Sequence, residues 1–120
     1  MKQTTEQYRA KAAWEQVNSI EVNDEFLSAA NGAASMIQAS GMGQAVAFWL
    51  AKGGKHTKLL DFLAQWLCKR PDSTTADDTK KGRDLMKYIT EIDSTEYRHL
   101  TTEAIAYLGW IKRFAKANKS

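Results

Sequence analysis

The chain has 120 residues, which is enough for one compact domain and leaves no room for a second. Hydrophobic residues make up 43% and charged residues 26%, close to the averages of soluble globular domains, so neither a disordered nor a fibrous protein is indicated. The net charge of +3 is only a weak signal for nucleic-acid binding. With one proline and much alanine, leucine, lysine and glutamine, the composition predicts an all-α single domain over 1–120.

The first two helices are predicted from capping residues and apolar spacing. Apolar residues, Trp14 among them, recur every three or four positions after a Thr4…Gln7 capping pair, which predicts a helix over about 5–19. Asn23 or Asp24 can cap a second helix that continues through about residue 39. Gly41 is suited to end it.

A glycine-bounded apolar segment, GMGQAVAFWLAKGGK at 41–55, predicts the third helix over about 42–52. It does not fit a phosphate-binding loop, because Val46 takes the place of the third glycine and no Lys-Ser or Lys-Thr pair follows. Its uninterrupted apolar run, 45–51, is far shorter than the roughly 20 residues that span a membrane. A helix that is apolar all round is expected to be buried. We therefore interpret it as the central strut of the core.

The fourth helix is predicted over about 56–70, with a broad leucine-rich stripe and an end ahead of Pro71. Trp49 and Trp66 lie within apolar stripes and are expected in the core. The polar, turn-rich segment at about 71–80 is predicted to be a mobile connection.

A shorter fifth helix is predicted over about 80–92, and the longest one follows over about 95–117. Asp93 and Glu96 offer a capping box for this last helix. The sequence has no repeat at a fixed period, so we expect a compact bundle of about six helices.

The last helix is expected to turn a basic side away from the core. At about 100° per residue, its apolar residues fall on one arc and its cations on the opposite one. The inward positions are Leu100, Ala104, Tyr107, Leu108, Ile111, Phe114 and Ala115, and the outward cations are Arg98, Lys112, Arg113 and Lys116. Gly109 lies within the outward arc, so a phosphate chain could approach the backbone closely there.

Two further features complete the candidate binding surface. Lys52 and Lys55, beside a glycine pair, form a second candidate patch for nucleic acid. Trp110 lies at the edge of the apolar arc of the last helix, where it could fill a contact with a partner subunit. Each basic residue is also compatible with an ordinary solvated helix surface.

The sequence offers little for catalysis, cofactors or metals. Cys68 has no nearby histidine, and His56 and His99 belong to different helices without metal-ligand spacing. The pair Asp77 and Asp78 is explained as a solvated loop or helix start rather than a magnesium site. We expect no enzyme activity, no cofactor and no metal. A single cysteine and the lack of a signal-peptide pattern favour a reducing cytoplasm.

Several segments together resemble a known family. They are YRAKAAWEQV (8–17), GAASMIQAS (32–40), GMGQAVAFWLAKG (41–53), LLDFLAQWL (59–67) and YRHLTTEAIAYLGWIKRFAKA (97–117). In order and spacing the chain resembles the small helical subunit of the type III-B CRISPR RNA-silencing complex, the Cmr complex. The resemblance covers nearly the whole chain and rests most on the third and fifth segments.

The resemblance implies a non-catalytic structural subunit of an antiviral ribonucleoprotein. Such a subunit stacks beside the guide-RNA-bearing backbone subunit and further copies of itself, and helps line the channel that holds guide and target RNA. Cleavage belongs to other subunits. The alternative left open is a helical protein–protein interaction module whose basic faces touch no RNA.

Overall fold

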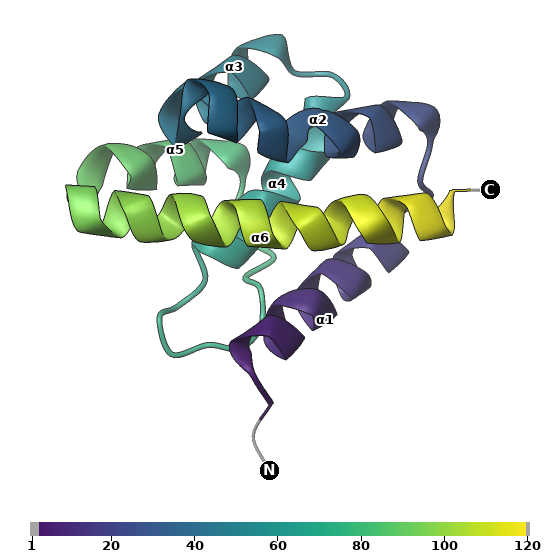
Figure 1. The fold of residues 1–120 in the computed structure, drawn as a ribbon, viewed down its shortest axis with the longest axis horizontal. Coiled ribbons are helices and arrows are strands. Elements are labelled where there is room, and N and C mark those ends of the chain that lie inside the picture. The colour runs from purple at the N-terminus through teal and green to yellow at the C-terminus, as the bar shows by residue number, and fades with distance from the viewer. Residues whose placement is uncertain (1–2, 120) are drawn as a thin grey trace.

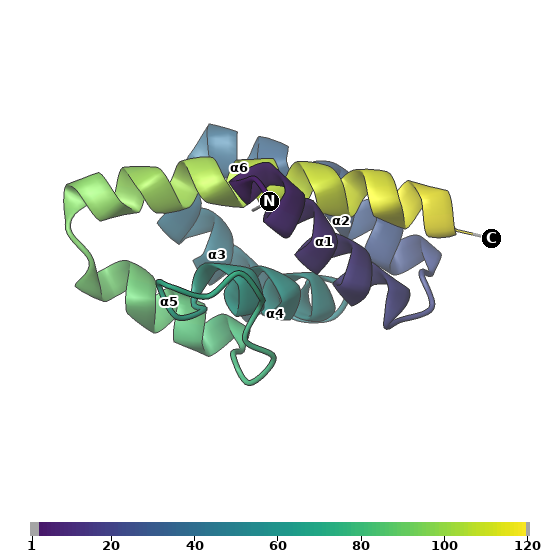
Figure 2. The same cartoon turned by 90° about the horizontal axis from the view of Figure 1, so that it is seen from below.

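The computed structural model describes residues 3–119, and these fold into six α-helices without a strand (Figure 1). The helices are α1 (Thr5–Asn18), α2 (Asp24–Ser40), α3 (Met42–Lys52), α4 (His56–Leu67), α5 (Gly82–Glu91) and α6 (Ser94–Asn118). The predicted all-α bundle is confirmed. Figure 2 shows α6 along the upper side of the molecule and α3, α4 and α5 in a layer below it. None of the described helices is long and apolar enough to cross a membrane.

Capping residues set the starts of α1, α2 and α6, as the sequence predicts. Thr4 and Gln7 exchange two hydrogen bonds at the start of α1, and the Asn23 and Asp93 side chains accept from backbone N–H groups of α2 and α6. The predicted end of the fourth helix was three residues late. It ends at Leu67, because Cys68 already departs from the helical conformation, at φ −97° and ψ 11°, whereas Pro71 restricts only Arg70.

The third helix is not the central strut, and that prediction was wrong. Only one side of α3 is buried, through Met42, Ala45, Val46 and Trp49, while Phe48 is 44% exposed. The reason is that alanines supply much of the apolar character of the segment, and alanine is small enough to face water at little cost. The start of α3 contacts α6, because the backbone N–H of Gly43 donates to the Tyr97 hydroxyl of α6 at 2.8 Å.

The central helix is instead α4, which packs against all five others. Its predicted apolar stripe is buried throughout, and Ala64 is buried with it: Leu59, Leu60, Phe62, Leu63, Trp66 and Leu67. Burial of a large apolar side chain stabilises a fold by roughly 1.5–3 kcal/mol. Among the described helices, α4 therefore contributes the most residues to the hydrophobic core.

A buried polar cluster joins α1, α4 and α6 within that core. The Tyr107 side chain of α6 is fully buried, and its hydroxyl donates to the Gln16 side-chain oxygen of α1. The Gln16 amide in turn donates to the Phe62 carbonyl at 3.1 Å and to the Gln65 side-chain oxygen at 3.0 Å, both on α4. Each polar group of this cluster thus has a partner, which is the condition for burying it without a large penalty.

A second polar cluster lies nearer the surface. Glu103 of α6 accepts two hydrogen bonds from Arg9 of α1, at 2.5 and 2.8 Å, and one from the Trp66 indole of α4, at 2.8 Å. Burial alone raises the pKa of the Glu103 carboxyl, but these donors, with the charges of Arg9 and Lys69, outweigh it and leave the pKa below its usual value. The Lys69 ammonium lies 4.1 Å from the centre of the Trp66 ring.

The connection between α4 and α5 is held at one point by a backbone hydrogen bond from Asp77 N–H to the Gln65 carbonyl, 2.8 Å long. Asp77 also accepts from the Thr79 hydroxyl and amide, and Ala76 packs against the core. The mobility predicted for residues 71–80 remains a prediction.

Tyr107→Phe is expected to lower the free energy of unfolding by about 1–3 kcal/mol, because it leaves the buried Gln16 oxygen without a donor. Urea titration followed by circular dichroism measures the change. Tyr88→Phe is the matched control, since the half-buried Tyr88 hydroxyl bonds to no residue in 3–119 and its loss should change stability by less than about 0.5 kcal/mol. Equal losses in both variants would contradict the role given to the buried cluster.

Glu103→Gln is expected to lower stability at pH 7 by about 1–2 kcal/mol. The pKa of Glu103 is lower in the folded protein than in the unfolded chain. Its contribution to stability is therefore complete above the pKa of the unfolded chain, about 4.3, and is lost as the pH falls through the pKa of the folded protein. The difference between wild type and variant should therefore narrow below about pH 4. Glu15→Gln, at an exposed site, should change stability by less than about 0.5 kcal/mol at pH 7. A difference from wild type that stays constant down to acid pH would refute the assignment to Glu103.

Candidate nucleic-acid interface

The outward side of α6 carries the four cations that the sequence placed there. Arg98, Lys112, Arg113 and Lys116 are exposed, and we call them the basic arc. The helix is continuous from Ser94 to Asn118, so the arc is not broken by a kink. In Figure 1 α6 lies across the front of the molecule, with α1 and α2 on either side of it. The inward positions are buried as predicted, except that Phe114 is only partly buried.

The cations of the basic arc are not neutralised by neighbouring carboxylates. Across residues 3–119 the two ion pairs are Arg9 with Glu103, and Lys119 with Asp24 at 3.3 Å. Neither involves the arc. Four unpaired positive charges along one helix face create a local positive potential that attracts polyanions.

The backbone at Gly109 is less open than expected. A side chain added there would come within 3.7 Å of the Arg113 guanidinium, because Arg113 folds back along the helix over the glycine. A phosphate at this place would therefore meet the guanidinium first. The expectation of bare backbone at Gly109 is corrected to a backbone lying under a flexible cation.

The second candidate patch lies apart from the first. Lys52 and Lys55 flank the turn between α3 and α4, where Gly53 and Gly54 have positive φ angles of 61° and 56°. In Figure 1 the chain between α3 and α4 turns at the upper edge of the molecule, with α2 between it and α6 in that view. The Lys52 ammonium lies 5.8 Å from the Phe48 ring centre, and the Lys55 ammonium donates to the Ser28 hydroxyl at 3.1 Å.

The charge near Lys55 is mixed. A shallow depression of about 230 Å³ is lined by Lys55 and Lys58 but also by Glu21 and Glu25. The opposite charges reduce the local potential, so this patch is a weaker candidate for phosphate binding than the basic arc.

The tryptophans divide into two classes. Trp49 and Trp66 are each 2% exposed and belong to the core, as predicted. Trp110 is partly buried at the edge of α6, whereas Trp14 is 46% exposed even though its spacing placed it with the apolar residues of α1. The structure brings Trp14, Trp110 and Phe114 together, which sequence spacing within single helices does not reveal.

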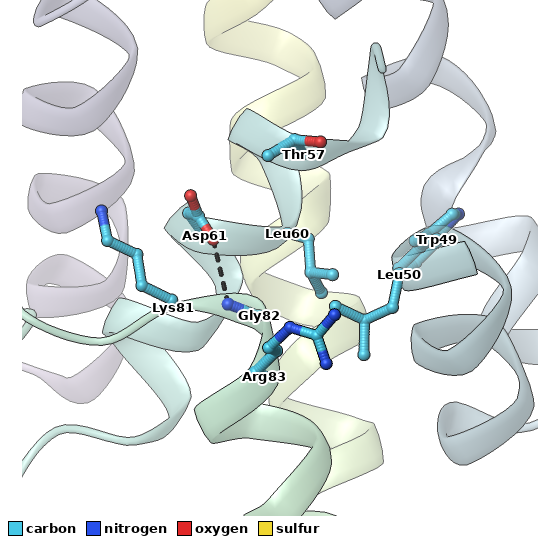
Figure 3. Close-up of a pocket in the computed structure, with 8 residues that line it drawn as sticks. All are labelled: Trp49, Leu50, Thr57, Leu60, Asp61, Lys81, Gly82 and Arg83. Carbon is cyan, nitrogen blue, oxygen red and sulfur yellow. Dashed lines mark hydrogen bonds between the residues drawn. The ribbon is translucent and has the colours of Figure 1, made fainter. Parts of the chain in front are cut away.

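A depression of about 270 Å³ between α3, α4 and α5 has a structural explanation (Figure 3). Asp61 of α4 accepts a hydrogen bond of 2.9 Å from the backbone N–H of Gly82 at the start of α5. Figure 3 shows Arg83 extending toward Leu50 beside this bond. The carboxylate thus caps α5 from a neighbouring helix, which gives it a structural role at this place.

Two of the side chains considered for catalysis or metal binding have shifted pKa values. Burial raises the pKa of the Cys68 thiol to about 11, so it stays protonated near neutral pH despite Lys69 and Arg70 beside it in sequence. Hydrogen bonds from Thr79 lower the pKa of Asp77. Within the described part of the chain, no three histidine, cysteine, aspartate or glutamate side chains come together as metal ligands.

Comparisons with known proteins agree with this fold. The family model described as CRISPR-associated protein (Cas_Cmr5) matches residues 5–118. Among solved structures, the chain is similar to a CRISPR-associated Cmr5 family protein from Thermus thermophilus. The two are 28% identical, the match covers 98% of this chain and 100% of the other, and the TM-score is 0.83.

Gly82→Ala is expected to lower the free energy of unfolding by about 1–3 kcal/mol, because the added carbon would lie 2.6 Å from Leu60 Cδ2 and 2.7 Å from its Cγ. Gly32→Ala is the matched control. It has no neighbouring atom within 4 Å and lies inside α2, so it should stabilise by about 0.5–1 kcal/mol. Thermal unfolding measures both, and stabilisation by Gly82→Ala would contradict close packing of α5 on α4.

Proposed function

The chain belongs to the Cmr5 family of CRISPR-associated proteins and is a small subunit of the type III-B Cmr complex, and we propose that it contributes to that complex as a non-catalytic, RNA-contacting structural subunit. In this proposal it stacks beside the guide-RNA-bearing backbone subunit and further copies of itself. Its basic faces contact phosphates of guide and target RNA, and the complex acts in antiviral defence.

The basic arc is the observation that carries the proposal. Arg98, Lys112, Arg113 and Lys116 share one exposed face, and no carboxylate of the described chain pairs with them. Phosphates of the RNA backbone are the groups that such cations bind, and they carry no base identity. We therefore expect binding that is largely independent of sequence, as a subunit must show when the guide changes.

One copy of the chain is expected to bind RNA weakly. Four cations that each neutralise one phosphate of a single strand predict a slope of about −3 in a plot of log affinity against log salt concentration. Useful affinity would arise when several copies bind along one RNA, since each further contact is then intramolecular. Lys52 and Lys55 could add a second, weaker contact from another side of the subunit.

A protein-only interaction module is the rival function. It is favoured by the large neutral surface of α2 and α3, where no formal charge occurs between Glu25 and Lys52 and Phe48 is 44% exposed. Charge depletion and exposed aromatic residues are typical of the centre of protein interfaces. The two functions differ in whether the basic arc matters for RNA.

Lys112→Glu combined with Lys116→Glu is expected to weaken RNA binding by the isolated chain and to reduce the salt slope from about −3 to about −1.5, because two phosphate contacts are lost. Fluorescence anisotropy with a labelled RNA at several salt concentrations measures both quantities.

Arg83→Glu combined with Lys87→Glu is the matched control for this experiment. These cations are exposed on α5 with the same spacing of four residues, and their exchange changes the net charge equally. The proposal requires the α6 variant to lose more affinity than the α5 variant. Equal losses would indicate only a general effect of charge, and no salt-sensitive binding by the wild type would favour the protein-only function.

A further inference from the structure

Three aromatic side chains form a row on the surface where the C-terminal halves of α1 and α6 meet. Trp14 of α1 packs edge-on against Phe114 of α6, with ring centres 5.0 Å apart and an angle of 71° between the planes. Phe114 stacks with Trp110 at 5.5 Å and 29°. We call these three side chains the aromatic row. Because it joins two helices, it is fixed by the tertiary fold rather than by one helix.

The indole N–H groups of the row differ from that of Trp66 in the core. The Trp66 indole donates to Glu103 at 2.8 Å. The indoles of Trp14 and Trp110 donate to no residue in 3–119, and the Trp110 nitrogen is not buried. With Trp14 46% exposed, the row offers open aromatic surface and two free donors.

Cations border the row on both helices. Lys11, one turn before Trp14, and Arg113, one turn after Trp110, are both exposed. The nearest carboxylate of α6, Glu103, is already bound by Arg9, and Glu15 is turned about 100° around α1 from Trp14. The charge around the row therefore favours an anionic ligand.

The row is also continuous with the basic arc. Around α6, Trp110 is followed by Arg113 at about 60° and then by Lys116 at about 60° more. Open ring faces beside a line of cations are the combination by which proteins hold single-stranded nucleic acid, with bases on the rings and phosphates on the cations. A base paired within a duplex has both faces covered by its neighbours and cannot stack in this way.

We propose that the aromatic row stacks bases of single-stranded RNA whose backbone lies on the basic arc. The proposal rests on the RNA contact proposed above and adds to it a preference for unpaired strands. From the sequence alone Trp110 is expected to meet a partner protein. Its grouping with Trp14 and with cations on both sides favours RNA instead, and an acidic protein segment becomes the alternative that the experiment must separate.

The experiment measures binding of the full chain to a labelled single-stranded RNA of about 12 nucleotides, comparable with the sites of known single-strand-binding domains, and to the same strand in a duplex. Trp14→Ala should weaken single-strand binding about fivefold or more, as expected for the loss of one stacked base. The salt slope should not change, because no cation is removed. Duplex binding should not change either, and Trp14→Phe should restore most of the lost affinity.

Gln38→Ala is the control, because Gln38 is exposed on α2 and belongs neither to the row nor to the basic arc nor to the patch of Lys52 and Lys55. It should leave both affinities unchanged. Circular dichroism tests whether Trp14→Ala remains folded. We expect that it does, because the Trp14 side chain is exposed.

The outcomes distinguish the two proposals. Salt-dependent RNA binding that Trp14→Ala leaves intact, or weakens equally for single strand and duplex, overturns the stacking role alone. Loss of association with other Cmr subunits at unchanged RNA affinity assigns the row to a protein contact and also overturns it. Absence of any salt-dependent RNA binding by the wild type overturns the phosphate contact, and the stacking role with it.

Discussion

The rotation of α6 about its own axis is the constraint on which the functional surface depends. Neighbouring residues of a helix differ by about 100° in direction, so a small turn of α6 would bury cations and expose core residues. The Tyr107 hydroxyl prevents this, because it reaches its buried acceptors, the Gln16 side-chain oxygen and the Phe62 carbonyl, in only one position of the ring. The bond between Glu103 and Trp66, one turn earlier, imposes the same rotation independently. The basic arc faces outward because these inward polar groups have fixed partners.

Much of the fold could be predicted from the sequence, since its determinants are local. Caps at Thr4, Asn23 and Asp93 act within three residues, and the stripe of α4 follows from helical spacing alone. The outward direction of the cations of α6 is likewise a property of one helix. Such features need no knowledge of which helix packs on which.

The predictions were wrong or incomplete where the burial or the partner of a side chain depends on neighbouring helices. The apolar character of α3 indicates burial, but only its contacts decide that one side stays open. Trp14 has the spacing of a core residue, yet it packs edge-on against the partly buried Phe114 and remains 46% exposed. Gln16 gives a weak local signal, as a polar residue between Ala13 and Val17 on the buried side of α1, while its partner Tyr107 is 91 residues away. Pairings of this kind follow from tertiary structure and are not encoded in spacing.

The packing of α1 against α6 also determines when the chain can complete its fold. The hydrogen bonds between them join residues 91, 94 and 100 positions apart, from Gln16 to Tyr107, Arg9 to Glu103 and Asn18 to Asn118. During synthesis the first helix leaves the ribosome long before its partner exists, and its apolar side has no surface to cover it. Contacts of such separation carry a large closure entropy and slow the folding reaction. The α1 helix therefore cannot complete its packing until α6 has been synthesised. During that interval the nascent chain is most exposed to chaperones and to aggregation.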